Sequence, residues 1–274
     1  MNSRLLPGQR RFRAFAGCAV VIVSVLILVW QFNSKTEPVY DGKSLSAWLE
    51  EYEKTFRLWN NPPDSGAREA IVRIGADALP FLLNYIASED PLQVKWQIQK
   101  ATGGPAHPSD SPEAHSHSLG IAGFAALQER AKPAEGALQR MLGSRKALIR
   151  RNAAICLGYL GQAGVTAIPE LLAHVEDEDR EVSNAAIWAL GNLGEQSDYV
   201  VPRLVELTSR EYPSLEVFEA LAKFGDRARI AVPKLKQLAE GRDPAVALLA
   251  VETVERIDAV TGAELRAKLR GRKP

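Results

Sequence analysis

The sequence predicts an all-α solenoid preceded by one transmembrane helix, and three observations support this fold class. Three segments align without gaps, each with a glycine and a proline eight residues apart: Gly161 to Pro169, Gly194 to Pro202 and Gly225 to Pro233. An apolar, amphipathic run precedes each glycine, and another follows each proline. One long apolar run lies near the N-terminus, while the whole chain is 24% charged, as an ordinary soluble protein is.

The N-terminal candidate anchor is Ala14–Trp30, a segment of seventeen residues without charge. As a helix it would span roughly 25 Å, close to the thickness of a bilayer core. Residues 1–35 contain five basic residues and no acid, and four of the five precede the segment. The positive-inside rule then predicts a single-pass protein of the inner membrane, with residues 1–13 as a basic cytoplasmic N-terminus and the remainder periplasmic.

Two other interpretations of this segment stay open. A cleaved signal peptide would need small residues after the apolar run, and here Val29-Trp30-Gln31 is bulky. A lipoprotein would need the apolar run before Cys18, and here most of the run follows it.

Residues 31–43 are expected to be a linker between the anchor and the solenoid. Ser44 is suited to cap a helix that follows it. The apolar residues of this helix share one face, which we expect to cover the open end of the first repeat. They are Leu45, Trp48, Leu49, Tyr52 and Phe56.

Each repeat unit is predicted to be a helical hairpin. Glycine ends the first helix, where a left-handed residue is needed, and proline occupies the first turn of the second. Such a hairpin buries its apolar face only by stacking on its neighbours, which gives a solenoid. Weaker copies surround Gly75, Gly136 and Val246–Leu269, so the solenoid should contain about six hairpins over residues 44–270, followed by a basic tail at 271–274.

These hairpins resemble HEAT repeats, because an acidic turn at Glu176–Asp179 precedes Val182-Ser183-Asn184-Ala185-Ala186. More narrowly, they are similar to short bacterial HEAT repeats that are related to those of phycobilin lyases. The segment Tyr40–Leu49 is also similar to the entry segment of membrane-anchored bacterial HEAT-repeat proteins. The resemblance implies a right-handed α-solenoid. Ser183 stands where the family often has arginine, so we expect an incomplete ladder of Asp–Arg pairs between repeats. A tetratricopeptide array is the alternative fold, but it would place proline late in the unit.

An insertion of about 23 residues separates the hairpins around Pro80 and Gly136. It should contain a helix over Leu92–Lys100 and a polar loop over 103–118. The loop contains His107, His115 and His117, which are weak candidates for a zinc site. A histidine-containing surface loop is the simpler interpretation, and we predict neither a metal nor a cofactor.

The resemblance places the second helix of each hairpin on the concave face of the solenoid. The residues one and four positions after the proline should then point into a groove. The partner-binding residues predicted in this way, with His174 beside them, are Arg140, Glu170, His174, Arg203, Glu206, Lys234 and Gln237. The alternative is a solvated helix face with modest ion pairs. Trp188 and Cys156 lie in apolar stripes and are expected in the core.

Charge and motifs exclude several functions. Residues 36–261 carry 24 basic and 32 acidic side chains, a field that repels nucleic acid. The chain has no Gly-x-Ser-x-Gly, Walker or His-Glu-x-x-His motif, so no enzyme is predicted. We therefore expect a membrane-anchored scaffold that binds a protein or peptide partner. The alternatives are a purely structural spacer and, by family resemblance, a lyase-like enzyme acting on a tetrapyrrole-like ligand.

Overall fold

The computed structural model describes residues 36–58, 66–88, 112–210 and 213–271. The chain divides into two units, Met1–Glu37 and Pro38–Pro274, and the helices described below belong to the second unit. The predicted anchor Ala14–Trp30, the predicted helix Leu92–Lys100 and His107 lie outside the described residues.

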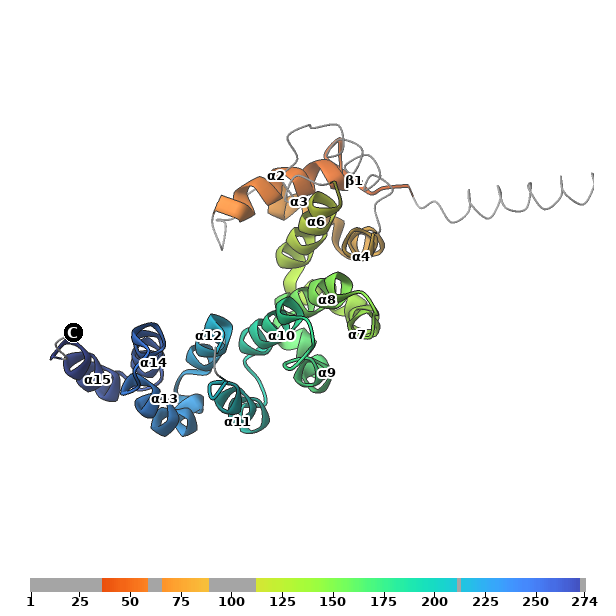
Figure 1. The fold of residues 1–274 in the computed structure, drawn as a ribbon. Coiled ribbons are helices and arrows are strands. Elements are labelled where there is room, and N and C mark those ends of the chain that lie inside the picture. Colours follow the sequence, from red (N-terminus) through yellow and green to blue (C-terminus); the bar gives the residue numbers. More distant parts are fainter. Residues whose placement is uncertain (1–35, 59–65, 89–111, 211–212, 272–274) are drawn as a thin grey trace, which may run out of the picture. The chain divides into compact units, whose positions relative to one another are not determined.

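The second unit is built almost entirely of helices, which pair into six hairpins within the described residues (Figure 1). The pairs are α3 (Gly66–Ile74) with α4 (Leu79–Ala87), α6 (Pro112–Leu127) with α7 (Glu135–Leu142), α8 (Ala147–Tyr159) with α9 (Ile168–Ala173), α10 (Arg180–Leu193) with α11 (Ser197–Leu207), α12 (Leu215–Phe224) with α13 (Val232–Ala239), and α14 (Pro244–Ile257) with α15 (Ala259–Gly271). This arrangement confirms the predicted all-α array of hairpins.

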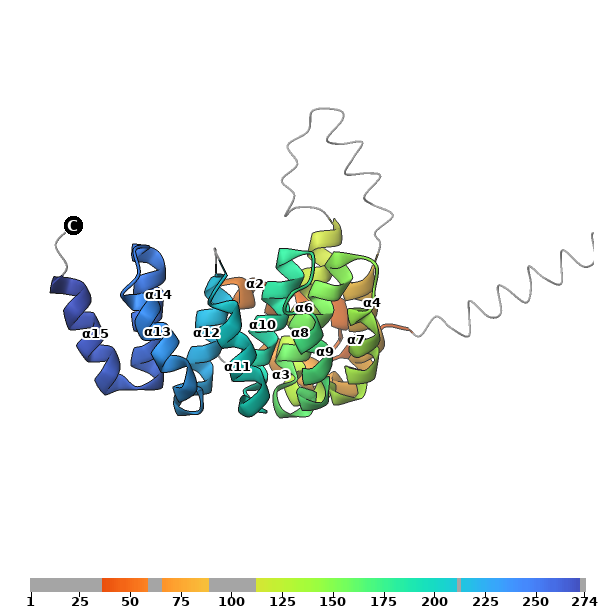
Figure 2. The ribbon, with the colours of Figure 1, turned by 60° about the horizontal axis from the view of Figure 1, so that its bottom comes forward.

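The hairpins stack mainly through their first helices. Helix α8 packs on α10, α10 on α12, and α12 on α14. The second helices α4, α7, α9, α11 and α13 each pack on the first helix of the following hairpin, and α15 packs on α14. The first helices α8, α10, α12 and α14 therefore form one row, and the second helices α7, α9, α11 and α13 form another (Figures 1 and 2). On the side away from the second helices, α10, α12 and α14 carry no further helix of the described residues (Figure 1). We call this side of the first-helix row the first-helix face.

Small residues allow the first helices to approach closely. A Cβ atom added at Gly158 would lie 2.8 Å from the Cα atom of Ala189, and one added at Gly191 would lie 2.8 Å from the Cα atom of Ala220. The two contacts are equivalent positions one repeat apart. Close packing of consecutive first helices is therefore a repeated feature of the array.

A residue with positive φ ends the first helix of five hairpins, as predicted. Glycine occupies four of these positions, with φ between 53° and 62°: Gly75, Gly161, Gly194 and Gly225. In the hairpin of α6 and α7 the position is taken by Gln128, with φ 51°, which is a strained conformation for a residue with a Cβ atom.

The prolines follow the predicted pattern with one exception. Pro80, Pro169 and Pro233 lie in the first turn of their helices. Pro202 lies inside α11 instead, because that helix begins earlier, at Ser197. The prediction of a first-turn position was therefore wrong for this hairpin.

The predicted linker contains a small β-hairpin. Strand β1 (Val39–Tyr40) pairs with β2 (Lys43–Ser44) around Asp41-Gly42, where both residues have positive φ, as an Asp-Gly hairpin turn requires. The hairpin is attached to helix α2 (Leu45–Leu58), because the indole Nε1 of Trp48 donates a hydrogen bond of 2.9 Å to the carbonyl oxygen of Tyr40.

Helix α2 packs on α3 and α6, as expected for a cover over the first repeat. Ser44 accepts a hydrogen bond from the amide of Ala47, which is the predicted cap. Four of the predicted apolar residues are buried: Leu45, Trp48, Leu49 and Tyr52.

The predicted loop over 103–118 is wrong for its last seven residues, because α6 begins at Pro112. Proline is favoured in the first turn of a helix, and the apolar run that ends at Leu127 extends the helix against α4. His117 is consequently buried, with its Nε2 atom 3.2 Å from the carbonyl oxygen of Ser88.

Among the described residues, the helical run Gly66–Ala87 is long and apolar enough to cross a membrane, judged by length and composition. It is interrupted at Gly75, where α3 gives way to a short turn before α4. Ile71, Leu82 and Ile86 are fully buried among neighbouring helices, as in the core of a repeat array.

Candidate functional site

The seven predicted partner-binding residues lie on the second helices or directly after one. Arg140 belongs to α7, Glu170 to α9, Arg203 and Glu206 to α11, Lys234 and Gln237 to α13, and His174 follows α9. We refer to these seven residues as the second-helix stripe. None of them lines the three hollows described below.

Ion pairs and hydrogen bonds within the chain hold part of the second-helix stripe. Arg203 donates to Glu206 at 2.6 Å and also contacts Glu176 in the preceding turn. Lys234 lies 3.5 Å from the amide oxygen of Gln237. Contacts of this kind occur on solvated helix faces, and a partner would have to compete with them for the same groups.

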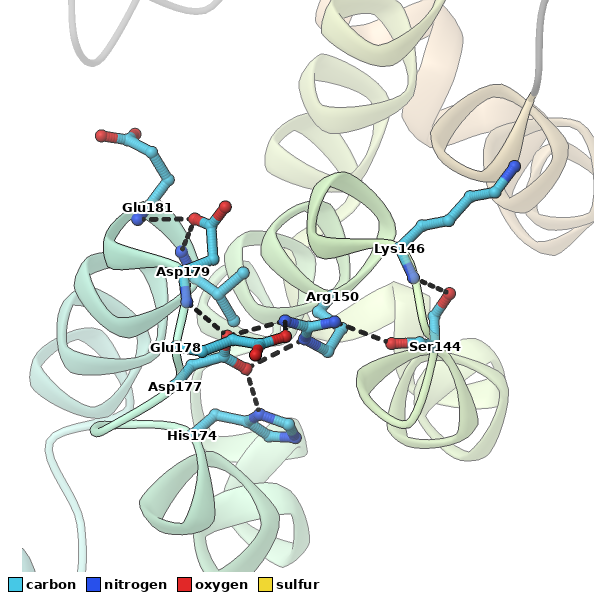
Figure 3. Close-up of polar contacts among 9 residues, drawn as sticks. Ser144, Lys146, Arg150, His174, Asp177, Glu178, Asp179 and Glu181 are labelled. Carbon is cyan, nitrogen blue, oxygen red and sulfur yellow. Dashed lines mark hydrogen bonds and ion pairs between the residues drawn. The ribbon is translucent and has the colours of Figure 1, made fainter.

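A buried cluster joins consecutive repeats beside this stripe (Figure 3). The Nη2 atom of Arg150 lies 2.7 Å from Oδ1 of Asp177, and Nε lies 2.9 Å from Oδ2. A third donor, Nη1, binds the carbonyl oxygen of Ser144 at 3.0 Å. Only 8% of the arginine side chain and 6% of the aspartate side chain are exposed.

The carboxylate of Asp177 accepts further hydrogen bonds. The amide of Asp179 lies 3.0 Å from Oδ1, and Nδ1 of His174 lies 3.0 Å from Oδ2. Burial alone would raise the pKa of Asp177, but the bonds from Arg150, Asp179 and His174 lower this pKa to about 2. The carboxylate is therefore ionised, and both of its oxygens accept hydrogen bonds from within the chain. The cluster thus acts as a structural joint between consecutive repeats.

The ladder of such joints is incomplete, as expected. Ser183 stands at the arginine position of the next repeat, and its hydroxyl donates a bond of 2.6 Å to the carbonyl oxygen of Val175. Arg203 and Arg210 contact Glu176 from the following segment of the chain instead. Ion pairs therefore link the repeats at different positions in different units.

An open site lies on the first-helix row, where two hollows of about 350 and 430 Å³ adjoin. Both are lined by Tyr159 and Trp188, whose ring centroids are 5.0 Å apart with an angle of 68° between the planes. We call these two hollows the aromatic groove. The other residues that line it are Ile121, Gln128, Glu129, Arg151, Ile155, Gly158, Gly161, Glu181, Asn184, Ala185, Asn192, Glu216 and Lys223.

Trp188 packs against the core but is only partly buried, so the predicted core position is correct only in part. Its side chain is half-buried, while Ile187 and Leu190 on the same helix are fully buried. The ammonium of Lys223 lies 5.4 Å from the indole centroid and 2.5 Å from Oδ1 of Asn192. The indole therefore keeps part of its surface open to solvent.

Cys156 is fully buried, as predicted. Burial raises the pKa of its thiol well above the ordinary value, so the thiol is not a nucleophile at neutral pH.

A third hollow, of about 410 Å³, continues the first-helix face between α12 and α14. We call it the α12–α14 hollow. Its apolar lining includes Leu215, Phe218 and Leu249, and its polar lining includes Glu219 and Glu252. Leu215 is 49% exposed at its edge.

The first helices carry three exposed leucines among the described residues. Besides Leu215, the exposed leucines Leu148 and Leu248 lie on first helices, and they are 40% and 42% exposed. The sequence contains one signal of the first-helix face, which the prediction of the second-helix stripe overlooked. Ile155 and Tyr159 on α8 and Trp188 on α10 are large apolar residues that lie beside the fully buried face of their helices. They widen the apolar stripe beyond what the core needs.

His115 and His117, the two candidate histidines that the structure describes, do not come together. His115 is exposed and His117 is buried, because residues two apart on a helix point to different sides. Within the described residues, no group of three or more His, Cys, Asp or Glu side chains is placed to hold a metal ion.

Comparison with known proteins finds a similarity in the central repeats. Residues 134–216, from the end of the turn before α7 to the start of α12, match the family model for HEAT repeats. No curated protein matches the sequence. The crystal structure of an engineered protein is similar over 77% of this chain and 96% of that chain, with 20% identity and a TM-score of 0.40. HEAT repeats typically mediate protein interactions, and residues 134–216 of this chain are similar to them.

Proposed function

We propose that this protein is a non-enzymatic scaffold that binds a segment of a partner protein through the first-helix face, centred on the aromatic groove. The observation that carries the proposal is the half-buried pair of Tyr159 and Trp188, which lines two adjoining open hollows. Tyrosine, tryptophan and arginine dominate the binding energy of protein interfaces, and Arg151 lines the same groove.

The groove suits an elongated partner segment. Its lining comes from α6, α8, α10 and α12, so an occupant would cross several consecutive first helices. The exposed leucines Leu148 and Leu215 on the same row would extend an apolar contact beyond the aromatic pair. HEAT repeats in general bind protein partners, which supports the same class of ligand.

The second-helix stripe remains the second candidate surface. Its exposed members recur at the period of the repeat, as a binding stripe would. Arg203 is already paired with Glu206 and Glu176, so a partner that used it would have to compete with those bonds. A partner could cover the rings of Tyr159 and Trp188 on the first-helix face without breaking an ion pair, and we favour this face for that reason.

We also propose that Ala14–Trp30 anchors the protein in the inner membrane, with the repeats in the periplasm. The support is the charge-free apolar segment and the arginines before it. Anchoring would hold the repeats near membrane-associated partners and raise the effective concentration of each for the other.

Site-specific photo-crosslinking tests the proposed binding surface. A photoreactive residue replaces Asn184 in the aromatic groove, and a matched control replaces Arg140 on the second-helix stripe. We expect a discrete adduct from position 184 that is lost when Trp188→Ala is added. An adduct from position 140 alone would move the site to the second-helix stripe, and no adduct at either position would favour a structural spacer.

A further inference from the structure

We infer that the first-helix face recognises a short extended segment in which two apolar side chains flank a basic residue. This inference rests on the proposed function and specifies the chemistry of the partner. It follows from two apolar hollows on one face and from the acidic helix that separates them.

The first apolar side chain would occupy the aromatic groove. There Ile121, Ile155 and Ala185 form an apolar lining together with the rings of Tyr159 and Trp188. An aromatic or branched aliphatic side chain would bury apolar area in it, and an aromatic ring could also pack against the edge or face of the indole.

The second apolar side chain would occupy the α12–α14 hollow. Phe218 and Leu249 line this hollow, and Leu215 is half exposed at its edge. A leucine or methionine side chain of a partner would remove that exposed leucine from water.

Helix α12 presents carboxylates to both hollows. Glu216 lines the aromatic groove, and Glu219, one turn later, lines the α12–α14 hollow. Glu252 of α14 lines the same hollow, with its carboxylate 3.9 Å from Arg266. A basic side chain that crosses α12 between the two hollows would therefore meet carboxylates on either side.

Most of the basic groups on this face are already engaged. Arg266 binds Glu255 through two nitrogens, Lys223 lies against Asn192 and Trp188, and Arg151 lies 3.7 Å from Glu181. Together the three hollows are lined by six acidic and four basic side chains. The resulting negative potential favours a cationic segment and opposes an anionic one.

The spacing of the hollows sets the length of the segment. Packed helices lie about 8–10 Å apart, so hollows centred over α10 and between α12 and α14 are separated by roughly 12–15 Å. An extended chain covers this distance in about four residues, at roughly 3.3 Å per residue. The expected pattern is an apolar residue, a basic residue two positions later and a second apolar residue two positions after that.

Peptide binding to the purified full chain tests this pattern. The probe is a fluorescent peptide of about ten residues, with tryptophan, arginine and leucine at alternate positions and serine and glycine elsewhere. One control peptide has glutamate in place of the arginine, and a second has serine in place of both apolar residues. Fluorescence anisotropy should show binding of the probe, with affinity reduced about tenfold or more for each control.

Protein variants assign the binding to the face. Trp188→Ala should weaken the probe about tenfold, whereas Tyr199→Ala, an exposed aromatic on α11 that lines none of the three hollows, should have no effect. The double variant Glu216→Lys/Glu219→Lys should reverse the preference, so that the glutamate peptide binds better than the arginine peptide. Circular dichroism confirms that each variant is folded.

The outcomes separate this inference from the proposed function. Equal binding of the arginine and glutamate peptides, or no binding of either, overturns the inference. The proposed function still holds in that case if the crosslink at position 184 forms and depends on Trp188. If that crosslink also fails, both are wrong.

Discussion

The guanidinium of Arg150 and the carboxylate of Asp177 form a two-point ion pair across consecutive repeats, with both side chains almost completely buried (Figure 3). Removing one partner of such a pair leaves a buried charge without compensation. Arg150→Ala should therefore lower the free energy of unfolding by about 3–5 kcal/mol, measured by urea denaturation.

An exposed ion pair provides the control for this variant. Arg73 and Glu69 lie 3.3 Å apart on α3 with about two thirds of each side chain exposed. Arg73→Ala should change the free energy of unfolding by less than about 0.5 kcal/mol. Equal effects of the two substitutions would show that the buried pair is no structural joint.

The pH dependence of stability should follow the ionisation of Asp177. Its pKa is about 2 in the folded protein against an ordinary value of 3.8, so the folded state is stabilised when the carboxylate is ionised. The contribution of about 2 kcal/mol is complete above about pH 5 and is lost as the pH falls through 3.8 toward 2. Unfolding measured from about pH 6 to pH 2 should show this loss in the parent protein and a smaller loss in Asp177→Asn. If stability fell equally with pH in the parent protein and in Asp177→Asn, the pH dependence could not be assigned to Asp177.

Gln128 is the one non-glycine residue among the five described positions that end a first helix with positive φ. A left-handed conformation costs a residue with a Cβ atom about 1 kcal/mol, and glycine avoids this cost. Gln128→Gly should raise the midpoint of thermal unfolding, and the reverse exchange Gly161→Gln should lower it. A destabilised Gln128→Gly would mean that the glutamine side chain contributes more than the backbone strain removes.

Gly191 tests the close packing of the first helices. A Cβ atom there would lie 2.8 Å from Cα of Ala220, which is backbone and cannot move without displacing α12. Gly191→Ala should lower the free energy of unfolding by about 1–3 kcal/mol. Gly136→Ala is the matched control: its nearest neighbour is the end of the Arg140 side chain at 3.8 Å, so alanine should be neutral or stabilising in α7.

Topology can be tested with a fusion of alkaline phosphatase after Pro274. The enzyme folds actively only outside the cytoplasm, so an active fusion is expected from the positive-inside bias. Deletion of Ala14–Trp30 should abolish the activity. An inactive fusion with the complete chain would overturn the periplasmic location.

Periodic signals made most of the fold predictable. The spacing from Gly161 to Pro169 and its copies reflects two local requirements of the backbone. One residue must adopt a left-handed conformation, and another can lack an amide hydrogen. Both requirements depend on few neighbouring residues. The start of α6 was harder to predict, because the sequence around His115 and His117 is polar and is typical of a loop. The contacts with Ser88 and α4 that stabilise a helix here are visible only in the structure.

The candidate site was less predictable than the fold. The exposure of Trp188 depends on how far α8 and α12 stand from α10, which is a property of stacking rather than of the local sequence. The choice of the second helices followed from family resemblance alone. The positions of Leu215 and Tyr159 on the opposite row became informative only when the helices were placed side by side.

The first-helix face, rather than the second-helix stripe, is the surface that we propose to hold the partner. Its decisive test compares Trp188→Ala with Arg203→Ala in the retention of the partner identified by crosslinking, measured by quantitative co-purification from cells with both variants at equal abundance. We expect about a tenfold loss of the partner for Trp188→Ala and full retention for Arg203→Ala. Loss of the partner with Arg203→Ala and retention with Trp188→Ala would place the binding surface on the second helices instead.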